Sequence, residues 1–161
     1  MGKLASLLAA ACLVLGACGG DSEGAGGDAE PSPQTSFPYA TALLDNGDES
    51  TLVTVEVAET PEQHELGLAG RTSLDEDRGM VFVFFEERET GFWMKDTTIP
   101  LSIAYFDADG TIVRIMDMEP CEEEPCHLYE PGVAYMGALE VNQGSFEEWD
   151  ISEGDSIRLT R

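Results

Sequence analysis

The chain has 161 residues and carries 32 Asp and Glu against 8 Lys and Arg, which gives a formal net charge of -24 at pH 7. So acidic a surface repels phosphate backbones and anionic headgroups, and we therefore expect no nucleic acid among its partners. The acidity names no ligand by itself, because a solvated acidic surface also serves solubility.

Residues 1–17 have the anatomy of a lipoprotein signal peptide. A short basic start precedes the uncharged apolar run 4–17, whose last residues form a lipobox, Leu15-Gly16-Ala17, directly before Cys18. The run has 14 residues, fewer than the roughly 20 of a membrane-spanning helix. We therefore expect cleavage before Cys18 and acylation of its thiol, with the lipid as the contact to a membrane of the cell envelope.

The next segment, 18–36, predicts a flexible acidic linker that follows the lipidated cysteine. From residue 19 to 34 it is rich in Gly, Ser, Ala, Pro and acids, with no apolar side chain larger than alanine. Such a segment buries too little surface to fold. Residues 37–161 remain as one domain of ordinary size.

Within 37–161 most apolar residues alternate with polar ones, the period of a half-buried strand. Seven segments have this pattern: 51–58, 80–84, 92–95, 101–106, 111–117, 135–141 and 156–160. The turn DADG at 107–110 indicates a hairpin. It does not fit a calcium loop, because Gly110 is its fourth residue and not the sixth.

One helix is clearly signalled, and a second short one is expected at 145–149. Thr60 can cap the helix, Pro61 suits its first position, and Gln63 completes a capping box. Leu66 and Gly70 mark the end of the helical segment. His64 would then be a solvent-side residue of this helix. Together these elements predict a mainly β, compact antiparallel β-barrel or sandwich-like single domain with one or two short helices.

Residues 92–100, FWMKDTTIP, combine an aromatic platform, a cation, an acid and hydroxyls, a mixture that small-molecule pockets use. The candidate ligand site takes Trp93, Lys95 and Asp96 from this block and Glu140 and Asn142 from the strand near 140. In a simpler interpretation these residues have structural roles only. The Trp93 ring would be buried, Lys95 would pair with an acid, and Asp96 would bond the backbone of a turn. Glu140 and Asn142 would point outward from their strand.

No catalytic residue and no cofactor is assigned. The sequence contains neither a histidine, serine and acid pattern typical of a hydrolase, nor a G-x-S-x-G motif, nor a phosphate-binding glycine loop after a strand. An enzyme with a site around Trp93, Lys95, Asp96 and Glu140 stays an alternative, since a general acid and base would need a second titratable group beside Glu140.

Cys121 and Cys126 are the cysteines that remain once Cys12 leaves with the signal peptide and Cys18 is acylated. In an oxidising compartment we expect them to form a disulfide around the loop CEEEPC, with a stabilisation of about 2 kcal/mol. The alternative joins both thiols to His127, Met116 and Met118 as soft ligands for copper. Because methionines also fill β-cores and the compartment favours oxidised cysteines, no metal site is assigned.

Several blocks in order carry a family resemblance. They are Gly79-Met80 before an aromatic strand, the block 92–95 followed by 99–101, and Leu139-Glu140-Val141-Asn142 with Gly144. Over residues 53–159 the chain resembles the domain-of-unknown-function 192 family. The resemblance implies a compact, β-rich, barrel-like fold, and it brings no established reaction or ligand.

These observations together predict a membrane-anchored extracytoplasmic lipoprotein with a β-rich domain. We expect that domain to be a non-catalytic binding or accessory module of the cell envelope. Its partner, a small molecule or an envelope protein, is left open.

Overall fold

The computed structural model describes residues 35–161. The predicted signal peptide 1–17, the lipidation site Cys18 and the linker up to residue 34 lie outside the described residues. Two helices and nine strands are present in the described part: β1 (Tyr39–Asp45), β2 (Ser50–Ala58), α1 (Pro61–Leu66), β3 (Arg78–Arg88), β4 (Phe92–Trp93), β5 (Leu101–Phe106), β6 (Ile112–Met118), β7 (Leu128–Tyr129), β8 (Tyr135–Asn142), α2 (Ser145–Glu148) and β9 (Ser156–Thr160).

Seven strands form one sheet in the order β6-β5-β8-β3-β2-β1-β9, and β4 pairs with β7 outside it. The expected mainly β architecture is confirmed. One pairing departs from the antiparallel pattern, because β2 and β3 run parallel with Val55 opposite Gly79. The reason is the crossover between them: α1 and the loop after it carry the chain back to the same end of the sheet, as a parallel pair requires.

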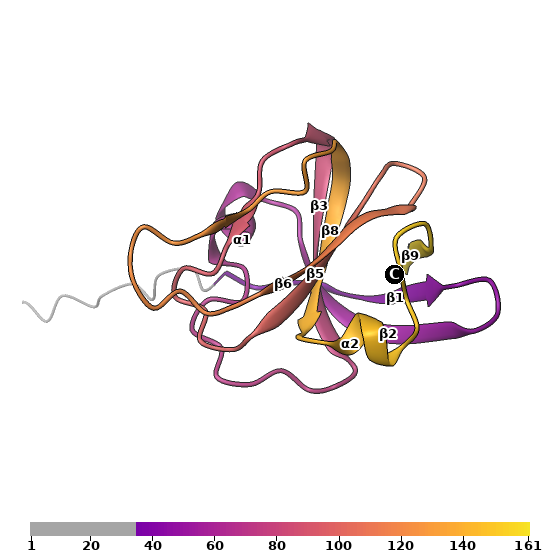
Figure 1. The fold of residues 1–161 in the computed structure, drawn as a ribbon, viewed down its shortest axis with the longest axis horizontal. Helices are drawn as coiled ribbons and strands as arrows, with labels where there is room; N and C mark the ends of the chain where they lie inside the picture. Colours follow the sequence, from indigo (N-terminus) through magenta and orange to yellow (C-terminus); the bar gives the residue numbers. More distant parts are fainter. Residues whose placement is uncertain (1–34) are drawn as a thin grey trace, which may run out of the picture. The chain divides into compact units, whose positions relative to one another are not determined.

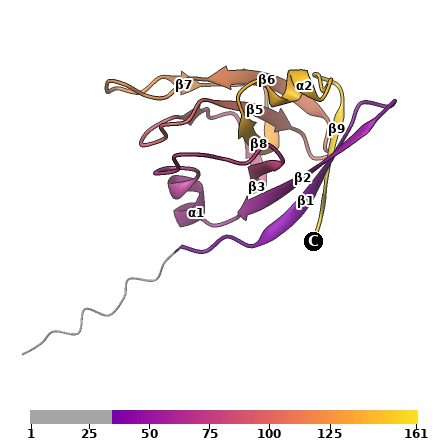
Figure 2. The same cartoon turned by 90° about the horizontal axis from the view of Figure 1, so that it is seen from below.

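The sheet curls into a half-barrel (Figures 1 and 2). Its two edge strands, β6 and β9, approach each other at one end. Thr111, just before β6, forms a bridge with Ser156 of β9. The Ile157 amide donates a 2.7 Å hydrogen bond to the carbonyl of Gly110, in the predicted turn. Asp107 fixes that turn, because its carboxylate accepts bonds from the amides of Asp109 and Thr111.

The central strands β3, β5 and β8 carry apolar side chains on both faces, and all six residues of β5 are buried. One face packs inside the half-barrel against β1, β2 and β9. The other face packs under α1, the β4 segment and the loops around β7. Figure 1 shows α1 and the β1–β2 hairpin on opposite sides of these strands. The outer layer determines where the candidate site lies.

Both predicted helices are present. Thr60 caps α1, and its side chain and that of Gln63 form the expected capping box. Strands β1 and β7 were not predicted. The first has an alternating burial pattern, with Ala42 and Leu44 fully buried, whereas β7 has only two residues and exists through its pairing with β4. No helix among residues 35–161 is long and apolar enough to cross a membrane.

Candidate functional site

A cavity of about 400 Å³ opens on the outer face of β3 and β8. Its floor comes from these two strands, one wall from α1 and the turn after it, and the other from β4 with its flanking residues and Leu128 of β7. Its lining comprises His64, Glu65, Leu66, Gly67, Leu68, Phe82, Phe84, Thr90, Gly91, Phe92, Trp93, Lys95, Thr97, Leu128, Tyr135 and Glu140.

Glu140 is the acidic group on the cavity floor. It lies in β8 opposite Met80 of β3 and Ile103 of β5, and the residue is only 4% exposed. No side-chain hydrogen bond or ion pair among residues 35–161 includes its carboxylate; because every fully buried side-chain nitrogen or oxygen of these residues has a partner, the Glu140 oxygens are reached from the cavity. Burial raises the pKa of Glu140 to about 8, so the group is mainly a neutral carboxylic acid at pH 7.

The glycine opposite this part of β8 explains how β3 comes so close. A Cβ atom at Gly79 would lie 2.6 Å from the backbone oxygen of Glu140 and 3.0 Å from a methyl group of Val141. A side chain at this position would push the two strands apart. The Gly79-Met80 motif therefore has a local physical reason, close backbone approach beside the buried carboxyl group.

Aromatic rings in edge-to-face contact form much of the cavity's wall and its support. The ring centroids of Phe82 and Phe92 lie 4.8 Å apart, those of Phe84 and Tyr135 5.7 Å, and those of Tyr105 and Tyr135 4.8 Å. Such pairs fix the orientation of the rings.

The two tyrosine hydroxyls of this cluster donate to backbone carbonyls. Tyr135 donates to Thr90 at 2.6 Å, and Tyr105 donates to Tyr129 at 2.6 Å. Burial raises the pKa of both phenols above the ordinary value for tyrosine. Burial therefore keeps both hydroxyls protonated, and their hydrogen bonds to the backbone stabilise the cavity wall.

His64 is a site residue that the sequence reasoning placed on the solvent side, and that prediction was wrong. Its Nε2 atom lies 3.0 Å from the carbonyl oxygen of Ala58, which can only accept, so Nε2 carries the proton. The ring centroid lies 4.6 Å from that of Phe84. Because α1 is only six residues long and lies over the sheet, its histidine packs inward.

Three of the five predicted site residues line the one cavity: Trp93, Lys95 and Glu140. The simpler interpretation fails for two of them. Trp93 is 58% exposed and does not bury its ring. Glu140 points into the molecule because a second layer covers the outer face of the sheet, which alternation along one strand cannot reveal.

Asp96 and Asn142 are not among the residues that line this cavity. Asp96 has a positive φ of 58°, and its carbonyl accepts a 2.8 Å hydrogen bond from the Gly70 amide. The Asn142 side chain donates to the carbonyls of Leu74 and Asp75 at 3.0 and 3.2 Å. Both residues hold neighbouring loops in place.

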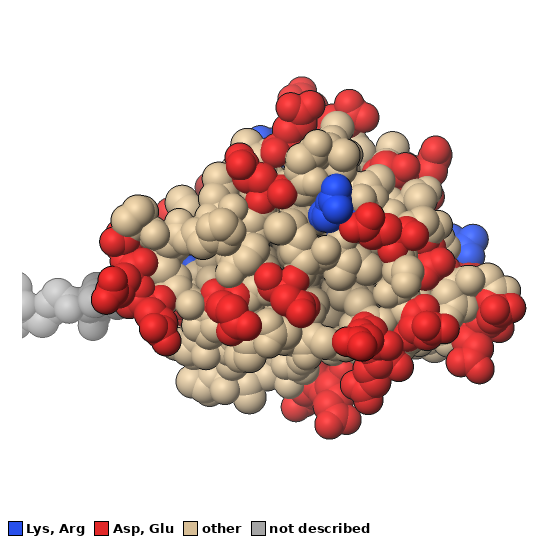
Figure 3. Space-filling view, in the orientation of Figure 1, with Lys and Arg blue, Asp and Glu red and all other residues tan. Residues whose placement is uncertain are grey.

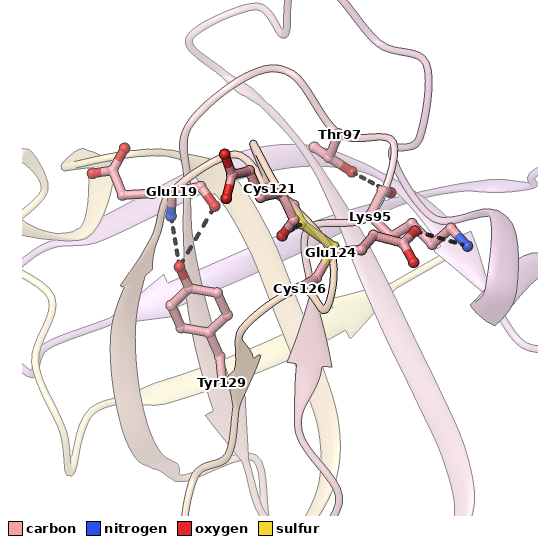
Figure 4. Close-up of a disulfide and its surroundings, with 8 residues drawn as sticks. Lys95, Thr97, Glu119, Cys121, Glu124, Cys126 and Tyr129 are labelled. Atoms are coloured by element: carbon pink, nitrogen blue, oxygen red, sulfur yellow. Dashed lines mark hydrogen bonds and ion pairs between the residues drawn. A yellow bond between two sulfur atoms is a disulfide. The ribbon is translucent and has the colours of Figure 1, made fainter.

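The predicted disulfide between Cys121 and Cys126 is present, with 5.4 Å between the Cα atoms. Figure 4 shows the bridged loop beside Lys95, whose Nζ atom lies 3.4 Å from Glu124 of that loop. At the loop's start the Glu119 amide donates to the Tyr129 hydroxyl at 2.9 Å. The bridged loop is thereby joined to a residue of the cavity wall.

The residues of the copper alternative do not form a ligand set in this arrangement. Both sulfurs of Cys121 and Cys126 are in the disulfide, and Met118 is fully buried in the apolar core. The His127 ring packs edge to face on Tyr129, 4.5 Å between centroids. Among residues 35–161 no group of three His, Cys, Asp or Glu side chains could hold a metal ion.

Comparison with known proteins gives a family and a fold. The model of the family DUF192, described as "Uncharacterized ACR", matches residues 42–159. No curated protein matches the chain.

Two solved structures are similar. One, from Sinorhizobium meliloti, is described as a candidate transcription regulator; it is 30% identical with a TM-score of 0.72, and the match covers 78% of this chain and 97% of that one. The other is a protein of unknown function from Novosphingobium aromaticivorans, 23% identical with a TM-score of 0.65. The match covers 79% of this chain and 89% of that one, and it supports the fold alone.

Proposed function

We propose that this chain, which belongs to the DUF192 family, is an extracytoplasmic lipoprotein that binds a small molecule without catalysis. Cys18 anchors it to a membrane of the cell envelope, and the linker holds the β-rich domain away from that surface. The cavity on the outer face of β3 and β8 is the binding site.

The observation that carries the binding proposal is the unpartnered Glu140 on the cavity floor. A buried carboxyl group without a hydrogen-bond partner costs folding free energy, and proteins keep such groups where they serve a site. Mainly apolar and aromatic walls with a few polar groups are typical of small-molecule pockets. Glu140 would supply the orienting contact, and the rings around it the apolar surface.

A second hollow of about 430 Å³, beside α2, lacks this combination. Acidic side chains contribute much of its lining, among them Asp117, Glu147, Asp150 and Glu153. The second hollow is similar in volume to the first cavity, but its charged lining offers a ligand little apolar surface to contact. This hollow is the internal control for the binding experiment.

The same geometry favours binding over catalysis. A general acid and base pair needs two titratable groups within hydrogen-bond reach of one reacting centre. Asp96 does not line the cavity, and the Tyr105 and Tyr135 hydroxyls donate to backbone carbonyls. Lys95 is engaged with Glu124 at the surface. The alternative of an enzyme at this site therefore has less support than a binding module.

The charge of this chain does not favour the role that is described for the Sinorhizobium meliloti protein. A net charge of -24 opposes contact with nucleic acid. Figure 3 shows acidic side chains spread over the face that it draws, with few basic ones between them.

Fragment screening by nuclear magnetic resonance tests the proposal. The full chain carrying Cys18→Ala is labelled with ¹⁵N and mixed with a set of small aromatic amines, alcohols and acids. We expect amide shifts to change at Gly67, Gly91, Trp93 and Glu140, and not at Glu147 or Glu153 in the control hollow. No bound fragment at all, or shift changes centred on the control hollow, would contradict the binding site.

A further inference from the structure

We infer that the ligand of this cavity is a small organic cation, an ammonium group on an apolar or aromatic body, with the ammonium group at Glu140. The inference rests on the proposed function and adds the chemical class of the ligand. Its support comes from the carboxyl group on the floor, the aromatic rings around it, and the pairing of the nearby Lys95 with Glu124.

The carboxyl group of Glu140 has no polar partner among the described residues. Glu140 is 4% exposed and lines the cavity, and its carboxylate takes part in no side-chain hydrogen bond within residues 35–161, so its oxygens are open to the cavity. A ligand ammonium would complete a charge-assisted hydrogen bond there, the strongest kind available to a carboxylate. A ligand carboxylate would be repelled by the acidic surface, whose net charge is -24, and would meet like charge wherever Glu140 is ionised.

The walls also favour a cation. Phe84, Phe92, Trp93 and Tyr135 all line the cavity, and an aromatic face attracts a cation within about 6 Å of its centroid. The wall already contains one such contact, since the Arg88 guanidinium lies 5.2 Å from the Phe84 centroid. The net charge of -24 further raises the local concentration of cations at the mouth.

The basic side chains that the structure describes near the cavity contact other groups of the protein. Lys95 pairs with Glu124, Arg88 stacks on Phe84, and His64 donates from Nε2 to the Ala58 carbonyl. The titratable and charged groups around Glu140 are His64 and Glu65 from α1, Arg88 from β3, Lys95 after β4, Tyr105 from β5 and Tyr135 from β8.

Proton release distinguishes a cation from a neutral ligand. Because burial raises the pKa of Glu140 to about 8, the free protein holds this proton at pH 7. An ammonium ligand favours the ionised carboxylate, so binding sends about one proton to the buffer, and affinity falls about tenfold per pH unit below pH 8. A neutral ligand that accepts a hydrogen bond needs the protonated group and releases none.

Calorimetry with a matched pair of probes tests this. The full chain carrying Cys18→Ala is titrated at pH 7 with 2-phenylethylamine and with 2-phenylethanol, in two buffers of different ionisation enthalpy. We expect the amine to bind at least about tenfold more tightly than the alcohol, with about one proton released per amine bound.

Two variants separate the carboxylate from the rings. Glu140→Gln keeps the shape and should abolish both the preference for the amine and the proton release, while the alcohol still binds. Trp93→Leu, at an exposed wall position, should weaken the amine several-fold more than the alcohol. Glu148→Gln on α2 makes the same charge change outside the cavity and should alter neither probe's affinity.

The outcomes divide cleanly. Alcohol binding as tight as amine binding, or amine binding without proton release, overturns the inferred ligand class but leaves the binding site standing. Binding of neither probe, together with no bound fragment in the screen, overturns the proposed function as well. An unchanged amine preference in Glu140→Gln shows that the cation lies elsewhere.

Discussion

Glu140 is only 4% exposed, its carboxylate has no protein partner among the described residues, and the residues opposite it, Met80 and Ile103, are apolar. Most carboxyl groups in folded proteins avoid that situation, because the charged form loses its hydration. Here the cost is expressed as a raised pKa, and the cavity above the group gives a ligand access to it.

The free energy of unfolding should therefore contain a pH-dependent contribution from Glu140. Below about pH 4.5 Glu140 is protonated in both the folded and the unfolded chain. From there to about pH 8 only the unfolded chain ionises, so its contribution to stability falls as pH rises. Glu140→Gln removes the loss, and we expect it to be about 4 kcal/mol more stable than the parent chain at pH 8.

Urea denaturation from pH 4.5 to pH 8 measures the difference. Glu148→Gln is the control, because that side chain is exposed on α2 and should follow the parent chain at every pH. Parallel curves for Glu140→Gln and the parent would mean that Glu140 ionises alike in the folded and unfolded chain.

At the scale of elements, alternation and turn signals in the sequence predicted most of the fold. The capping box of α1 and the Asp107 turn depend on a few neighbouring residues, and both formed as expected. The parallel pairing of β2 with β3 depends on where a crossover returns, which no local pattern records.

The site was predictable only in part, for the same reason. The mixture of residues in 92–100 led to Trp93 and Lys95, which do line the cavity. The depth of Glu140 depends on the layer formed by α1 and the β4 segment, both remote from it in sequence. His64 was missed because a short helix pattern does not show which face packs on the sheet.

The disulfide loop is the element whose contribution to stability is easiest to isolate. Cys121 and Cys126 close six residues, and the loop contributes only Cys121, partly buried, to the apolar clusters. We expect the double variant Cys121→Ser, Cys126→Ser to fold and to lose about 2 kcal/mol of unfolding free energy. Chemical denaturation of both proteins gives the value.

Reduction of the parent chain with dithiothreitol provides the matched comparison, since it should reproduce the loss without any substitution. A double variant that does not fold at all would show that the bridge supports the core and not only its own loop.

At the scale of the whole molecule, acidity and anchoring belong together. Because the acidic surface repels anionic headgroups, the proposed attachment to a membrane would have to come from a lipid and not from charge. In the proposed arrangement the predicted lipobox before Cys18 would supply the lipid, and the polar composition of residues 19–34 suits a spacer.

Fractionation of cells that express the chain tests the anchor. We expect the parent protein in the membrane fraction and Cys18→Ala in the soluble fraction, with the disulfide of the domain intact in both. Cys18→Ala that stays with the membrane would exclude the thiol as the point of attachment.

The most direct test of the central claim is the titration of Glu140 itself. The side-chain carboxyl carbon of Glu140, labelled with ¹³C in the full chain carrying Cys18→Ala, is followed by nuclear magnetic resonance from pH 3 to pH 10, about the range in which the folded domain ionises its acids. The account predicts a midpoint near pH 8, several units above the ordinary 4.5, and a lower midpoint when 2-phenylethylamine is added. A midpoint near 4.5 without any ligand would contradict it, because the carboxyl group would then be hydrated or paired.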